Sequence, residues 1–147
     1  MARHCEAAGR TAQAIGHYQR AGERASQASA NEESIGHLRR ALELLATLPE
    51  TRERDRQELG LQVAITGPLS AARGWGHPEC EGALVRARAV ASQVGTLRER
   101  ARVLLGLGAS YNFGGHLATA PELASQAVEA AERPGGALEI LAAAHAL

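Results

Sequence analysis

The chain has 147 residues and a mass of 15.4 kDa, enough for one domain with a buried core. Its formal net charge is +0 and its pI is about 7.0, so no bulk electrostatic field draws it to nucleic acid or to an anionic membrane. All 16 basic residues are arginine and Asp55 is the sole aspartate, which excludes a P-loop, a Schiff-base lysine and a site of paired aspartates.

The residue inventory favours helices over strands. Aromatic residues make up 3% of the chain, alanine is its commonest residue, and the β-branched residues Val and Ile are sparse. The sequence has no charged-then-apolar signal segment, and Cys5 and Cys80 are too few for a disulfide framework. We therefore expect an all-α protein with free thiols in a reducing cytoplasm. No stretch is apolar for the roughly 20 residues that span a bilayer.

The first two predicted helices share a phrase. IGHYQRA at 15–21 is echoed by SIGHLRRA at 34–41. Asn31 is the predicted N-cap of the second helix, since acidic residues follow it and an apolar stripe begins at Ile35. In the first helix, small and apolar residues recur at steps of four and three and so form one face: Ala14, Tyr18, Ala21 and Ala25.

The rest of the chain contains charge runs and helix breakers. TRERDRQE at 51–58 is interpreted as a solvated linker or a helix start. Gly67-Pro68 predicts a kink inside a helical stretch, and Trp75 is expected to pack over a helix junction. TAPE at 119–122 predicts a capping box.

A longer repeat appears in the sequence when the first pair of predicted helices is compared with the rest of the chain. The tetratricopeptide signature is a 34-residue helix-turn-helix with W-x2-L-G-x2-Y in its first helix and A-x3-F in its second. Residues 101–134 resemble it closely, 15–48 match it well, and 61–94 match it in the second helix while the first is degenerate. Residues 1–14 and 135–147 resemble half repeats. The residues assigned to repeat packing are Tyr18, Gly22, Leu38, Ala41, Cys80, Leu84, Ala87, Leu104, Leu107, Gly108, Tyr111, Ala120, Ala124 and Ala127.

Several short sequence segments indicate a more specific resemblance. HYQRAGERA and EESIGHLRRALELLATLPE are similar to the repeat region of bacterial multidomain proteins. Those proteins join a class III adenylate or guanylate cyclase domain, or a transcriptional output domain, to a STAND-type or AAA-like ATPase and a C-terminal helical array. The resemblance implies that this chain is a regulatory or sensor segment and not an enzyme, with any catalytic domain outside it.

The tetratricopeptide resemblance implies an architecture and a partner. We expect antiparallel helix-turn-helix repeats stacked as a right-handed α-solenoid of about seven to eight helices, in a single domain over 1–147 that is a fragment of a longer array. A protein or peptide is expected in the concave groove formed by the first helices, without nucleic acid, membrane or cofactor. The half repeats predict self-association through uncapped ends. Side chains expected to face the groove are Gln19, Glu23, Gln62, Arg73, Arg102, Asn112 and Phe113.

Two rival interpretations stay open at this point. His77 and Cys80 form an H-x2-C pair that supplies two zinc ligands, so a small metal-binding or enzymatic helical protein is one alternative, although a structural zinc needs four ligands. The same residues also describe an ordinary helix start, with Pro78 in the first turn and acids beside it. The other alternative is a free-standing adaptor with no catalytic domain attached.

Overall fold

The computed structural model describes residues 2–115, with the surroundings of side chains from residue 9 onward. This part of the chain is entirely helical, with five helices and no strand. The helices are α1 (Ala2–Gln27), α2 (Asn31–Ala46), α3 (Arg52–Arg73), α4 (Pro78–Val94) and α5 (Leu97–Gly114). The predicted all-α class is therefore confirmed for residues 2–115.

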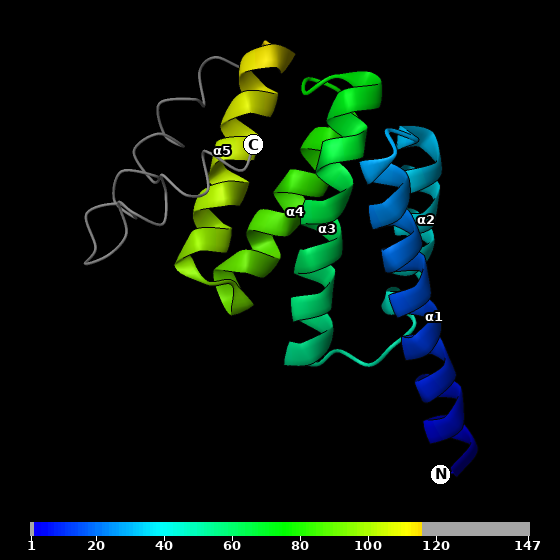
Figure 1. The fold of residues 1–147 in the computed structure, drawn as a ribbon. Coiled ribbons are helices and arrows are strands. Elements are labelled where there is room, and N and C mark those ends of the chain that lie inside the picture. Colours follow the sequence, from blue (N-terminus) through cyan, green and yellow to red (C-terminus); the bar gives the residue numbers. More distant parts are fainter. Residues whose placement is uncertain (1, 116–147) are drawn as a thin grey trace.

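Each helix packs on the next one in the chain, and α1 also contacts α3 (Figure 1). Turns of a few residues connect them, so neighbouring helices run antiparallel. The first turns of α1 project beyond the bodies of α2 and α3 (Figure 1). None of the helices in residues 2–115 is long and apolar enough to cross a membrane.

The core is a continuous layer of aliphatic side chains between the helices. On α2 the buried stripe includes Ile35, Leu38, Ala41 and Leu45, as the helical spacing predicts. Leu59, Ile65 and others extend the layer from α3, and α4 and α5 add their own apolar faces. Burial of these stripes supplies the main driving force, because isolated helices of this length are marginal in water.

Polar residues at the turns decide where several helices begin. The Thr51 hydroxyl accepts a hydrogen bond from the Arg54 amide at 3.1 Å, which starts α3 inside the TRERDRQE run. The helix-start interpretation of that run is confirmed. At α5, Thr96 and Glu99 form a complete capping box, with the Thr96 amide donating to the Glu99 carboxylate at 2.7 Å.

The predicted cap at Asn31 is wrong by one residue. Asn31 is the first residue of α2, the N-cap is Ala30, and no side chain caps this end. The tight turn before it explains the shift: Ser29 adopts a left-handed φ of 59°, so the chain enters the helix one residue earlier than predicted. Glu32 and Glu33 still occupy the first turn, where the helix dipole favours acids.

The predicted repeat boundaries at the N-terminus are also wrong. Residues 1–14 were expected to form a separate helix of a half repeat, but α1 continues from Ala2 to Gln27 without a break. No proline interrupts it, and its isolated glycines, Gly9, Gly16 and Gly22, are each too weak a breaker to end a helix. The five helices of residues 2–115 do not support the expected total of seven to eight. The predicted capping box at 119–122 and the half repeat at 135–147 lie outside the described residues.

Candidate binding groove and neighbouring ion pairs

The α1/α2 pair is held by a close approach at Gly22. The Ser34 hydroxyl is fully buried and donates to the Gly22 carbonyl at 2.8 Å. A Cβ placed on Gly22 would lie 2.7 Å from Cγ of Leu38, which is closer than two carbons can approach. Only glycine fits there without displacing Leu38, so two of the residues assigned to repeat packing, Gly22 and Leu38, meet at one crossing.

A groove of about 420 Å³ opens between α3 and α5, and we call it the α3/α5 groove. Its apolar lining comes from Val63, Pro68, Trp75, Leu84 and Val103. Hydroxyl groups of Ser26, Thr66 and Ser70 also line it, together with Ala64, Gly67, Gly106 and Arg102. Ser26 belongs to α1 and Leu84 to α4, so residues of α1, α3, α4 and α5 line the groove, most of them from α3 and α5.

Arg102 is the single charged residue among the described residues that line this groove. Its side chain is exposed, and within residues 2–115 it makes no hydrogen bond or ion pair. The hydroxyls of Thr66 and Ser70 are already used, because they donate to the carbonyls of Val63 and Gly67 at 2.7 Å and 2.8 Å. The groove therefore presents a mixed polar and apolar surface, with one cation that has no partner among residues 2–115.

Pro68 gives the α3 wall an unusual backbone. It is fully buried inside α3 and carries no amide hydrogen, so the helical bond that residue 68 would donate to the Ala64 carbonyl cannot form. Both residues line the groove. The helix nevertheless runs on to Arg73.

The turn between α3 and α4 holds the only tryptophan of the chain against the groove. Trp75 is half-buried and packs on the core, which confirms the predicted position over a helix junction. A Cβ on Gly76 would lie 2.8 Å from the Phe113 carbonyl oxygen, so the turn backbone rests directly on the end of α5. Trp75 thus has a fixed support while part of its ring faces the groove.

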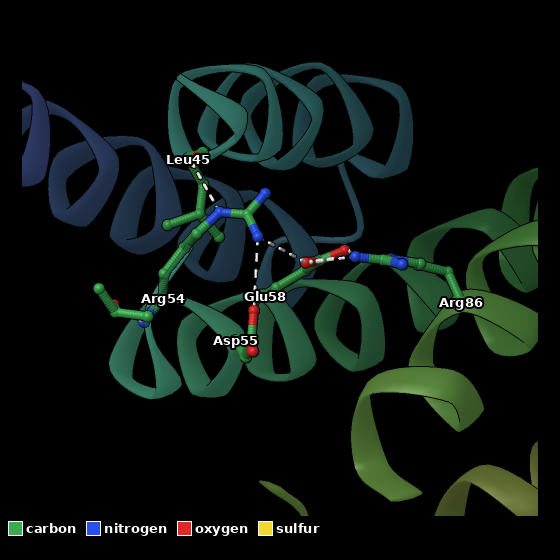
Figure 2. Close-up of polar contacts among 6 residues, drawn as sticks. Leu45, Arg54, Asp55, Glu58 and Arg86 are labelled. Carbon is green, nitrogen blue, oxygen red and sulfur yellow. Dashed lines mark hydrogen bonds and ion pairs between the residues drawn. The ribbon is translucent and has the colours of Figure 1, made fainter. Parts of the chain in front are cut away.

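The strongest electrostatic cluster lies away from the groove, around Glu58 on α3. Figure 2 shows Glu58 between two guanidinium groups: Arg86 of α4 donates to both of its oxygens at 2.5 Å and 2.9 Å, and Arg54 lies 3.8 Å away. Hydrogen bonds from Arg86 hold the pKa of the Glu58 carboxyl below its usual value, against the opposing effect of burial. The pair connects α3 to α4 with bidentate geometry.

Arginines also cover the carboxyl ends of neighbouring helices. Arg54 donates to the Leu45 carbonyl in the last turn of α2 at 3.3 Å (Figure 2), and Arg56 donates to the Val94 carbonyl of α4 at 2.7 Å. Arg100 of α5 reaches the Ala91 carbonyl of α4 at 2.9 Å. Neither α2 nor α4 has a basic residue in its own last turn. Neighbouring helices thus supply the cations that stabilise these ends.

A second ion network is centred on Glu79 at the start of α4. Both Arg39 of α2 and Arg73 of α3 donate to its carboxylate, and Arg73 also reaches Glu32 at 3.2 Å. Most of these side chains are at least partly exposed, so the network contributes less per pair than a buried one. It fastens the start of α4 to α2.

The residues expected to face a common groove are dispersed. Arg102 lines the α3/α5 groove, but Gln62 lies in a shallow depression between α2, α3 and α4, and Arg73 is committed to its ion pairs. Phe113 is 70% exposed at the end of α5, next to the exposed Asn112.

Gln19 and Glu23 are the α1 members of the expected set. They bond to each other at 2.9 Å on α1 and do not line the α3/α5 groove. Helical spacing alone does not reveal the crossing angle of two helices, and of the seven residues only Arg102 lines the α3/α5 groove.

The described residues assigned to repeat packing lie mostly at the positions expected of packing residues. Most of those within residues 2–115 are buried in the core or pack against it: Tyr18, Leu38, Ala41, Cys80, Leu84, Ala87, Leu104, Leu107 and Tyr111. Gly22 is buried at the crossing described above. Gly108 has no described neighbour close to its Cβ position. Ala120, Ala124 and Ala127 lie outside the described residues.

His77 and Cys80 serve structural roles in α4. His77 is the N-cap, and its Nδ1 accepts a hydrogen bond from the Glu79 amide at 3.3 Å. Cys80 is fully buried, and that burial raises the pKa of its thiol. Among the described residues, no group of three or more His, Cys, Asp or Glu side chains is placed to hold a metal ion. The helix-start interpretation accounts for both residues.

Four important residues escaped prediction. Gly106 permits α5 to approach α4, since its Cβ would lie 2.8 Å from a Leu84 methyl, yet the register had assigned the close approach to Gly108. Thr96 and Glu99 match the T-x-x-E pattern of a capping box, a signal that the sequence did contain. Glu58 carried no local signal, because its partner Arg86 is distant in the chain.

Comparison of the chain with protein-family models, with curated proteins and with solved structures finds no match.

Proposed function

We propose that this chain is a non-catalytic, tetratricopeptide-like scaffold whose α3/α5 groove binds a segment of a partner protein. The observation that carries the proposal is the groove itself: about 420 Å³, lined by both apolar and polar residues, and formed mostly by α1, α3 and α5, which contain the first helices of the three sequence registers. Concave apolar surfaces with few polar groups are the usual place for a ligand or peptide.

The crossing at Gly22 supports the repeat interpretation. In the register the glycine of the first helix faces the small residue and the large apolar residue of the second, and Gly22 meets Ser34 and Leu38 in that order. A stack of such pairs places alternate helices on one side, which is the arrangement that makes a groove. A right-handed solenoid with further repeats is part of the proposal.

The proposed role in the cell is regulatory. We infer from the resemblance of its phrases that the chain is the sensor segment of a cytoplasmic bacterial signalling ATPase or nucleotide cyclase. An enzyme or metal site centred on His77 and Cys80 is not favoured, since the first caps a helix and the second is inaccessible. The genomic sequence on both sides tests this role: an in-frame ATPase or cyclase domain supports it, and stop codons on both sides would leave a free-standing adaptor.

Binding in the groove is tested by blocking it. Gly67 lines the groove, and a Cβ at this position meets no atom within 4 Å outside its chain neighbours, so Gly67→Leu adds a side chain to the groove. Because Gly67 precedes Pro68, where a Cβ disfavours the helical conformation, circular dichroism first checks that the variant keeps its helix content. The full chain is used to select peptides from a random displayed library, and the selected peptides are then measured against the variant. We expect Gly67→Leu to weaken binding by at least about tenfold, equivalent to about 1.4 kcal/mol.

Gly36→Leu is the matched control. Gly36 is an exposed glycine in the interior of α2, also with no atom within 4 Å of its Cβ position, and it does not line the groove. This variant should bind the selected peptides as the unmodified chain does. Selection of no peptide, or equal binding to Gly67→Leu, would contradict the proposed use of the groove.

A further inference from the structure

We propose that the α3/α5 groove recognises a peptide segment in which an acidic side chain stands beside an aliphatic or aromatic one. The acidic group pairs with Arg102, and its neighbour packs on the apolar lining next to Trp75. This inference rests on the proposed function, because it names the class of partner that the same groove accepts.

Charge complementarity points to an acid. Arg102 is the only charge among the described groove-lining residues, and within residues 2–115 it has no partner of its own. Arg54, Arg86 and Arg100, in contrast, each donate to a carboxylate or a helix carbonyl and do not line the groove. A guanidinium at the edge of a partly apolar groove binds a carboxylate with bidentate hydrogen bonds, which sets Arg102 apart from other exposed arginines such as Arg52.

The apolar part of the lining favours a ligand that carries an apolar side chain beside the acidic one. The half-buried Val63, Ala64 and Trp75 supply the exposed apolar part of the lining, with the buried Pro68 and Val103 behind them, and a fully charged ligand would leave that part uncovered. An aliphatic or aromatic side chain placed there would remove apolar area from water. A free inorganic anion or a run of acids would satisfy Arg102 alone and leave this surface uncovered.

The backbone at Pro68 fits a peptide better than a nucleotide. The Ala64 carbonyl has lost its usual donor at position 68, and both residues line the groove. A carbonyl without that donor can accept a hydrogen bond from a peptide N–H. Nucleic acid would meet one arginine in a chain of net charge +0, which is too little positive charge to hold a phosphate backbone.

The test uses Trp75 as its reporter. Because it is the only tryptophan and lines the groove, its emission in the full chain reports occupancy directly. Peptides selected on the full chain are synthesised in pairs, with each acidic residue unchanged or replaced by its amide, and both are titrated at low and high salt. We expect the acidic member to bind at least about tenfold more tightly at low salt, and salt to reduce that difference.

Arg102→Gln separates this inference from the proposed function. The variant should bind acidic and amide peptides equally, while Arg52→Gln, an exposed arginine at the other end of α3, should keep the preference. Peptides that show no preference for an acid, or a preference that persists in Arg102→Gln, would overturn the inference while groove binding stands. Failure of any peptide to change Trp75 emission or to depend on Gly67 would overturn both.

Discussion

The helix pairs α1/α2 and α3/α4 have the same spacing of packing positions in the sequence, but different contacts hold the two helices of each pair together. In the first pair Gly22, Ser34 and Leu38 meet directly, and the Ser34 hydroxyl bonds the Gly22 carbonyl. In the second pair the matching positions hold Pro68, Cys80 and Leu84, and Leu84 lies against Gly106 of α5. The first pair is closed by close packing at the crossing.

The second pair relies on other contacts. Glu58 and Arg86 join α3 to α4 away from the crossing, and Pro68 lines the groove where the first pair has its glycine contact. The comparison teaches that one helical spacing closes a crossing either by backbone approach at a glycine or by burial of larger side chains such as Pro68 and Leu84. Five predictions test this difference, ordered by the size of the expected effect.

The largest effect is expected from Leu38→Ala in the closed pair. Leu38 is 1% exposed, so truncation removes apolar contacts and leaves a cavity that should lower the free energy of unfolding by about 3 kcal/mol. Urea denaturation of the full chain measures it. Val85→Ala, on the exposed side of α4, is the control and should stay within about 0.5 kcal/mol.

Gly22→Ala tests the contact between Gly22 and Leu38 directly. Alone it should destabilise the chain by about 1–2 kcal/mol, because the new methyl overlaps Leu38. In the Leu38→Ala background the methyl has room, and the gain in helix propensity should make the same change neutral or stabilising by up to about 1 kcal/mol. Additive effects in the double variant would contradict a direct contact between these residues.

Glu58→Gln should weaken the second pair by about 1–2 kcal/mol near pH 7, between the values of an exposed and a buried ion pair because Arg86 is half exposed. The pKa of Glu58 is lower in the folded chain than in the unfolded one, so its carboxylate stabilises the fold above the unfolded-state pKa of about 4.3. That contribution disappears as the pH falls through the folded-state pKa.

The difference in unfolding free energy between the original chain and Glu58→Gln should therefore shrink below about pH 4.3. Glu43→Gln, an exposed partner of Arg40 on α2, is the control and should cost at most about 0.5 kcal/mol. A difference that stays constant from neutral to acid pH would show that the ion pair is not what Glu58 contributes.

Ser34→Ala removes the hydrogen bond that seals the first pair. The expected loss is about 1 kcal/mol, because the buried Gly22 carbonyl loses a neutral donor. Ser92→Ala is the control, since this exposed hydroxyl of α4 bonds only to its own helix at the Ala89 carbonyl. Equal effects of the two changes in urea denaturation would argue against a role for Ser34 in the crossing.

The smallest effect is expected at the end of α4. Arg100→Gln should cost about 0.5–1 kcal/mol, because the Ala91 carbonyl loses its donor from α5 and the α4 dipole loses a cation. Arg98→Gln, an exposed arginine in the same turn of α5, makes no such contact and should be nearly neutral. Thermal unfolding followed by circular dichroism distinguishes the two.

The sequence by itself determined the helical class and much of the core. Composition and the steps of three and four indicated helices, and those steps depend only on 3.6 residues per turn, a local property. The register also singled out Gly22, Leu38 and Cys80 as packing residues, and each of them is buried. Pro78 and its acidic neighbours marked a helix start for the same local reason.

Only the tertiary structure decided which surface is open and which residues pair across it. Glu58 and Arg86 are 28 residues apart, and Arg102 reaches the groove because Gly106 lets α5 approach Leu84. Spacing along one helix does not specify the angle and offset at which two helices cross, and those quantities depend on side-chain volumes at the contact. The predicted groove set was dispersed for this reason, and the boundary at residue 14 was wrong because an uninterrupted helix needs no repeat boundary.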